Sequence, residues 1–160
     1  MADFIQLKKD NILRIGIKDV NGNETGESLQ FDLEDIELPL RLNECEAKHR
    51  KNVEFLRNQF LIIDKKEDKK GKFILSWKEE EKLKVLQDFY KREMEALDLF
   101  LGKNGCKKLL NGRNPYYAMY EDFTELLQPI LPKIKMTADD IAKKIKEKYN
   151  NKATEKNVLK

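Results

Sequence analysis

The stretch Leu97–Ile134, LDLFLGKNGCKKLLNGRNPYYAMYEDFTELLQPILPKI, decides how the rest of this chain folds. It predicts that a long helix ends at Gly102, because Gly102 and Gly105 readily take the positive φ that terminates a helix. One or two amphipathic helical turns follow, and Asn111-Gly112 stops them. The stretch therefore joins the end of one long helix, a short helical segment and the start of another.

A further helix is predicted over about 115–134. Asn114 fits its N-cap and Pro115 its first helical position, where the missing N–H of proline costs nothing. Pro129 and Pro132 each remove a backbone N–H, so we expect a kink or a break there. Apolar residues recur at steps of three and four: Tyr116, Met119, Tyr120, Phe123, Leu126, Leu127, Ile130 and Ile134. No polar residue here has the spacing of a catalytic group, so the pattern indicates packing and docking.

Residues 100–127, FLGKNGCKKLLNGRNPYYAMYEDFTELL, resemble the C-terminal part of the small tail assembly chaperones of long-tailed bacteriophages and prophages. The likeness rests on a Phe-Leu-Gly element, a short helix ending in Gly-Arg, and a helix with aromatic and leucine positions. The matching residues are Phe100, Leu101, Gly102, Leu110, Gly112, Arg113, Tyr117 and Phe123. The resemblance implies a non-enzymatic protein, made in the bacterial host cell, that binds the tape-measure protein and keeps it soluble during tail morphogenesis. It says nothing direct about the first 40 residues.

The aromatic residues that open the helix after Pro115 are the candidate partner-binding site: Tyr116, Tyr117, Tyr120 and Phe123. Tyrosine offers a large contact area with a polar end that tolerates water, so it can be exposed before binding and buried after it. The alternative is that these rings only pack against the long helix before Gly102.

The composition predicts a soluble protein with a heavily charged surface. The chain has 160 residues, enough for one domain, which we place at 1–149. Its 32 Lys and Arg nearly balance its 29 Asp and Glu, and both signs are mixed along the chain. Nucleic-acid-binding proteins usually segregate their charge, so this class is not favoured. The sequence has no apolar leader segment and no membrane-spanning run, which predicts a cytoplasmic protein without membrane association.

A β-hairpin is predicted over 11–34, because apolar residues alternate on both sides of the turn signal Asn21-Gly22-Asn23. The hairpin either covers one end of the helical core or pairs through its edge with another chain. That edge, together with a wide apolar arc around Val85 and Ala96, predicts a dimer or larger assembly.

Two long helices are predicted over about 38–64 and 76–102, joined by the charged loop Lys65–Lys72. Ser76 with Glu79 forms a capping box that opens the second helix. The residues expected to be largely buried are Leu86, Phe89, Leu97, Phe100 and Phe123.

At the C-terminal end, Thr137 with Asp140 predicts a capped final helix over 137–149. Residues 150–160 are polar with little to bury, and we expect them to be disordered. The predicted fold is therefore α+β and dominated by helix: an N-terminal hairpin, two long helices, and a helical section broken by proline.

No catalytic residue, cofactor or metal site is predicted. His49 lies on an apolar helix face without an identifiable partner, and Cys45 and Cys106 are expected to be buried free thiols. Two other functions remain open beside the chaperone: a helical scaffold or adaptor, and a nucleic-acid-binding protein that uses the Lys65–Lys72 loop and the lysine-rich final helix. Steep salt dependence of binding is expected only for the latter.

Overall fold

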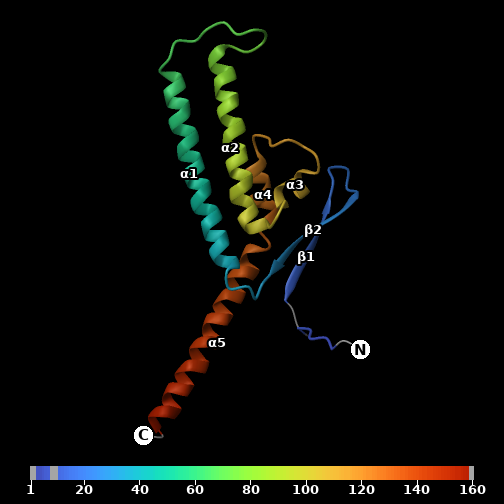
Figure 1. Cartoon of the computed structure of the whole chain (residues 1–160), viewed down its shortest axis with the longest axis vertical. Coiled ribbons are helices and arrows are strands. Elements are labelled where there is room, and N and C mark those ends of the chain that lie inside the picture. Colours follow the sequence, from blue (N-terminus) through green and yellow to red (C-terminus); the bar gives the residue numbers. More distant parts are fainter. Residues whose placement is uncertain (1–2, 8–10, 159–160) are drawn as a thin grey trace.

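The computed structural model describes residues 3–7 and 11–158, with side chains up to residue 150. Over these residues an N-terminal hairpin precedes a mostly helical chain, which confirms the predicted α+β class. The elements are, in chain order, β1 (Ile12–Lys18), β2 (Glu24–Asp32), α1 (Leu38–Asp64), α2 (Trp77–Leu101), α3 (Gly105–Leu110), α4 (Met119–Leu127) and α5 (Leu131–Val158). Figure 1 shows α1 and α2 side by side as a long helical hairpin, with the strands, α3 and α4 gathered around its lower half.

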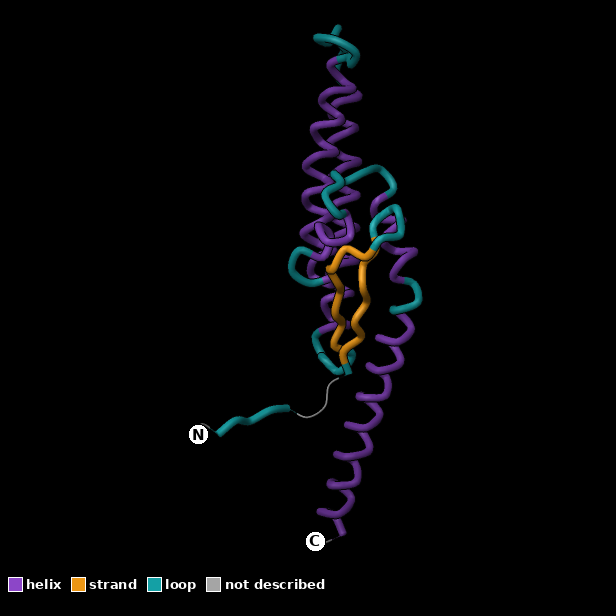
Figure 2. Tube along the Cα trace, turned by 90° about the vertical axis from the view of Figure 1, so that its right-hand side faces the viewer, coloured by secondary structure: helices purple, strands orange, loops and turns teal. Residues whose placement is uncertain are grey.

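The β-hairpin is held by its turn and by one apolar face. The Asp19 carboxylate accepts the backbone N–H groups of Asn21 and Asn23, each at 2.9 Å. Figure 2 shows the two strands lying along the flank of the helical body. Phe31 of β2 is buried, and its ring stacks on Phe100 of α2 with 5.0 Å between the ring centroids. The hairpin therefore covers one end of the helical core.

The two long helices occupy the predicted ranges. Pro39 lies in the first turn of α1, where proline needs no N–H partner. Ser76 is the N-cap of α2, and its hydroxyl accepts the backbone N–H of Glu79 at 3.2 Å, as the capping signal predicts. The charged segment 65–72 lies in the connection between the two helices.

The link from α2 to α3 confirms one glycine prediction and corrects the other. Gly102 ends α2 with a φ of 91°, as expected. The second residue with positive φ is Asn104 (φ 60°), not Gly105. Gly105 is needed for a different reason: it is buried, and a Cβ there would overlap the side chain of Leu101.

The predicted helix over 115–134 is wrong at its start. α4 begins at Met119, and its N-cap is Ala118, not Asn114. Residues 116–119 form a turn instead, in which the backbone N–H of Met119 donates to the carbonyl of Tyr116 at 3.0 Å, and the hydroxyl of Tyr90 on α2 donates to the carbonyl of Tyr117 at 3.1 Å. The local Asn-Pro signal therefore does not set the start of α4.

The helix break expected at the two prolines is confirmed. α4 ends at Leu127, and residues 128–130 form a turn that contains Pro129. Pro132 falls in the first turn of α5, a position that tolerates its missing N–H.

The separate final helix over 137–149 is wrong, whereas the predicted disorder of residues 150–160 stays a prediction. α5 runs without a break through Thr137, whose hydroxyl donates to the carbonyl of Lys133 at 2.9 Å instead of capping a new helix. Residues 150–158 continue the helix, while 159–160 lie outside the described residues. Beyond its first turn α5 contains no Gly or Pro and is rich in good helix formers, which explains its continuity.

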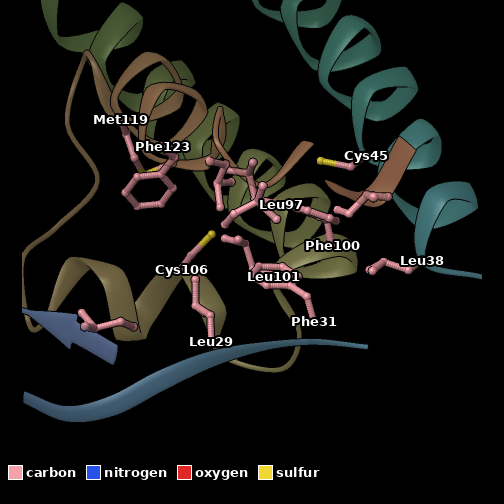
Figure 3. Close-up of a cluster of buried hydrophobic side chains, with 14 of the residues drawn as sticks. Leu29, Phe31, Leu38, Cys45, Leu97, Phe100, Leu101, Cys106, Met119 and Phe123 are labelled. Carbon is pink, nitrogen blue, oxygen red and sulfur yellow. The ribbon is translucent and has the colours of Figure 1, made fainter. Parts of the chain in front are cut away.

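The core lies where the lower ends of α1 and α2 meet the strands, α3 and α4 (Figure 3). Its buried members include Leu29, Phe31, Leu97, Phe100, Leu101, Cys106, Met119 and Phe123. Of the residues predicted to be core, Phe89, Leu97, Phe100 and Phe123 are buried. Leu86 is only half-buried, because it faces the groove described below. Cys45 and Cys106 are buried free thiols, as expected.

Candidate functional site

The four aromatic residues predicted to bind a partner do not share one face. Phe123 is buried in the core, so it is not available for binding. Tyr120 is half-buried against α1, where its hydroxyl donates to Glu46 at 2.9 Å. Tyr117 is 90% exposed, and Tyr116 is half-buried beside it. Only Tyr116 and Tyr117 are therefore placed to meet a partner.

Tyr116 and Tyr117 form one wall of a groove whose other wall is α2. The groove has a volume of about 750 Å³. Its apolar and aromatic lining consists of Leu83, Leu86, Tyr90, Pro115, Tyr116 and Tyr117. Leu83 is 48% exposed, so the groove presents apolar surface to solvent.

Three contacts hold the tyrosine wall in place. The Tyr90 hydroxyl donates to the carbonyl of Tyr117, and the Arg113 guanidinium lies 3.7 Å from the centre of the Tyr116 ring. The Tyr116 hydroxyl donates to Asp122 at 2.6 Å, and this hydrogen bond raises the pKa of Tyr116. A wall ordered before binding loses less conformational entropy when a partner arrives.

Polar side chains border the groove: Glu80, Lys84, Gln87 and Asn114. Glu80 and Lys84 pair with each other across one helical turn at 3.5 Å. An apolar floor with a mixed polar rim fits a protein segment that has one apolar face.

A second feature, a buried polar cluster, lies between the two long helices. Glu93 of α2 is 1% exposed. One of its oxygens accepts from the side-chain amide of Asn52 at 2.8 Å, and the other lies 2.7 Å from Nδ1 of His49. The His49 ring stacks on Tyr120, with 3.6 Å between centroids. The cluster ties α1, α2 and α4 together and gives His49 a structural partner.

The contact between Tyr120 and Glu46, beside this cluster, has a defined protonation state. Burial and the hydrogen bond to Glu46 raise the pKa of Tyr120 above its usual range. Burial opposes ionisation of Glu46, but hydrogen bonds from Tyr120 and Arg50 outweigh it and lower the pKa of Glu46. At neutral pH the contact is therefore a phenol that donates to a carboxylate.

Neither Glu93 nor Asn52 was predicted to belong to a polar cluster. The usable signal is the position of Glu93, four residues after Phe89 and four before Leu97, on the face of α2 that becomes buried. A charged residue in the middle of such a face needs a partner from another element.

A second groove, of about 570 Å³, lies between β1 and the junction of α4 with α5. Its lining is more strongly apolar and includes Leu13, Ile15, Leu126 and Ile130. None of the four predicted binding residues lines it.

Among residues 3–7 and 11–158, no group of three or more His, Cys, Asp or Glu side chains is placed to hold a metal ion. In the same part of the chain, no helix combines the length and the apolar character needed to cross a membrane. Comparisons with protein-family models, curated proteins and solved structures gave no match.

Proposed function

We propose that this protein is a tail assembly chaperone of a long-tailed bacteriophage or prophage, which binds the tape-measure protein through the groove between α2 and Tyr116–Tyr117. The observation that carries the proposal is the position of the groove. Two of the residues on which the family resemblance rests belong to this part of the molecule: Tyr117 lines the groove, and Arg113 supports its wall from behind by stacking on the Tyr116 ring. The stretch that resembles the family thus supplies one wall of the groove, and α2 supplies the other.

The chemistry of the groove suits a helical segment with an apolar face. Covering Tyr117, which is 90% exposed, and Leu83, which is 48% exposed, removes apolar area from water and stabilises the complex by about 25 cal/mol per Å² of that area. The evenly mixed surface charge, 32 basic against 29 acidic residues, favours solubility of the complex. Holding an apolar partner in solution needs these two properties and no reactive group.

The test is co-expression of the full chain with a helical, apolar tape-measure fragment, followed by measurement of the soluble, co-purifying fraction of the fragment. The wild-type chain is expected to keep the fragment soluble. The double variant Tyr117→Ser/Leu83→Ser is expected to lose most of this capture with an unchanged melting temperature.

The matched control is Phe73→Ser, which removes an aromatic ring that is 93% exposed in the connection between α1 and α2. It should capture the fragment as well as the wild type. An insoluble fragment in the presence of the wild type counts against the chaperone. Full capture by the groove variant would contradict the groove as the binding site but would leave the chaperone function standing. A helical adaptor would instead capture unrelated amphipathic helices equally well.

A further inference from the structure

The last helix, α5, projects from the body of the protein. Figures 1 and 2 both show it leaving the base of the helical hairpin and running away from every other helix. All the residues from 142 to 150 are exposed. An isolated helical segment of this length is only marginally stable in water, so contact with another molecule would stabilise it substantially.

An apolar stripe runs out of the core along this helix. It begins at Ile134, which is buried, and passes through Ala138 and Ile141, which are half-buried. It continues at Ile145 and Tyr149, which are 49% and 60% exposed. The steps of four, three, four and four residues keep these side chains on one face. The face that packs in the core therefore extends past the point where the body ends.

Lysines border the exposed part of the stripe on both sides. At about 100° per residue, Lys144 and Lys148 lie on one side and Lys146 on the other. Of the acidic residues of this region, Asp140 and Glu147 fall on the far side of the helix, and Asp139, on the same side as Lys146, pairs with Lys135 at 2.7 Å. A partner that covers the stripe must therefore approach between positive charges.

We propose that the projecting part of α5 docks an amphipathic helix of a partner protein whose apolar stripe is bordered by Asp and Glu. Such a partner places carboxylates opposite the flanking lysines, as the e and g positions do in a heteromeric coiled coil. A second copy of α5 fits less well, because it sets lysine against lysine. The inference rests on the proposed function only in that both take the partner to be helical.

The test uses the full chain and two labelled synthetic peptides of about 28 residues, with leucine at the a and d positions. One peptide has Glu at e and g, and the other has Lys there. Fluorescence anisotropy is expected to show at least about tenfold tighter binding of the Glu peptide, weakening as salt is added.

Two matched variants locate the site. Ile145→Ala/Tyr149→Ala removes the stripe while keeping strong helix formers, and it should weaken binding of the Glu peptide about tenfold or more. Lys143→Ala/Glu147→Ala changes the opposite face without altering net charge, and it should bind as the wild type does. Circular dichroism checks that both variants keep their helix.

Equal affinity for the two peptides, no binding of the Glu peptide, or equal loss in both variants would overturn the proposal. The alternative is that the chain self-associates through the stripe. Self-association would then be abolished by the stripe variant and unaffected by the Glu peptide, and this result would assign the stripe to a second copy of the chain. Since neither peptide contains tape-measure sequence, a failure here is distinct from a failure of the chaperone proposal.

Discussion

Replacing Glu93 with alanine should destabilise the protein by about 3 kcal/mol. The Glu93 carboxylate is the shared partner of His49 and Asn52 between α1 and α2. Alanine leaves both of these side chains without it, and each buried polar group left unpaired costs about 1–3 kcal/mol. The sum is about 2–6 kcal/mol. The lower half of this range applies, because the His49 side chain is 18% exposed and can recruit water.

The same reasoning predicts that removing the whole cluster costs less than removing its centre. In the triple variant His49→Phe/Asn52→Leu/Glu93→Met, no polar group is orphaned, and a phenyl ring can still stack on Tyr120. Replacing a buried polar network with apolar residues of similar volume is often close to neutral. We expect the triple variant to lie within about 1.5 kcal/mol of the wild type.

Urea unfolding followed by far-UV circular dichroism measures both effects. With a denaturant slope of about 2 kcal/mol per molar, Glu93→Ala should lower the midpoint by about 1.5 M. A midpoint for Glu93→Ala within error of the wild type would refute the structural role of the cluster. A triple variant as unstable as Glu93→Ala would show that packing, and not the orphaned polar groups, sets the cost.

Four further predictions follow from the packing. Phe89→Ala should cost about 3–5 kcal/mol in a thermal melt, as large core truncations do, and an unchanged melt would show that this face is not core. Gly105→Ala should lower the urea midpoint because its Cβ overlaps α2, whereas Gly16→Ala, with no neighbour within 4 Å, should not. Burial raises the pKa of Cys45 to about 11 and that of Tyr120 further, so both hold their protons more tightly when folded. The contribution of the two protonated groups to the stability of the folded state is complete below about pH 8 and declines as the pH rises through about 10. The urea midpoint should therefore be lower at about pH 10.5 than at about pH 8. Sedimentation at micromolar concentration tests the predicted self-association, and a clean monomer of 18.9 kDa would contradict it.

The elements that the sequence predicted well carry strong local signals. Ser76 caps α2 as expected, and Pro129 marks the break after α4. The errors arose where a local signal competed with something less visible. Pro115 has the features of a helix start, but the next residues form a turn packed against α2, and α4 begins only at Met119. Thr137 resembles an N-cap, yet it lies inside a helix that nothing interrupts.

The candidate site was predicted only in part for a related reason. Helical periodicity placed Tyr116, Tyr117, Tyr120 and Phe123 together because it assumed a helix from Pro115. With α4 starting at Met119, the two leading tyrosines lie in the turn before the helix, and the other two residues point toward the core and α1. The opposite wall of the groove comes from α2, some 30 residues earlier in the chain, and no local pattern connects the two.

The groove and the α5 stripe lie apart, which makes their contributions separable. Figure 1 shows the loop before α4 beside α2, while α5 leaves from the base of the molecule. The free-energy changes caused by substitutions at two distant sites with no shared contacts usually add. A single long partner that reaches both surfaces gains from linkage, so either variant alone weakens capture moderately and the two together abolish it. Two separate partners instead give two unrelated losses, one for each variant. Combining Tyr117→Ser/Leu83→Ser with Ile145→Ala/Tyr149→Ala in the capture assay therefore decides whether one helical partner spans the molecule.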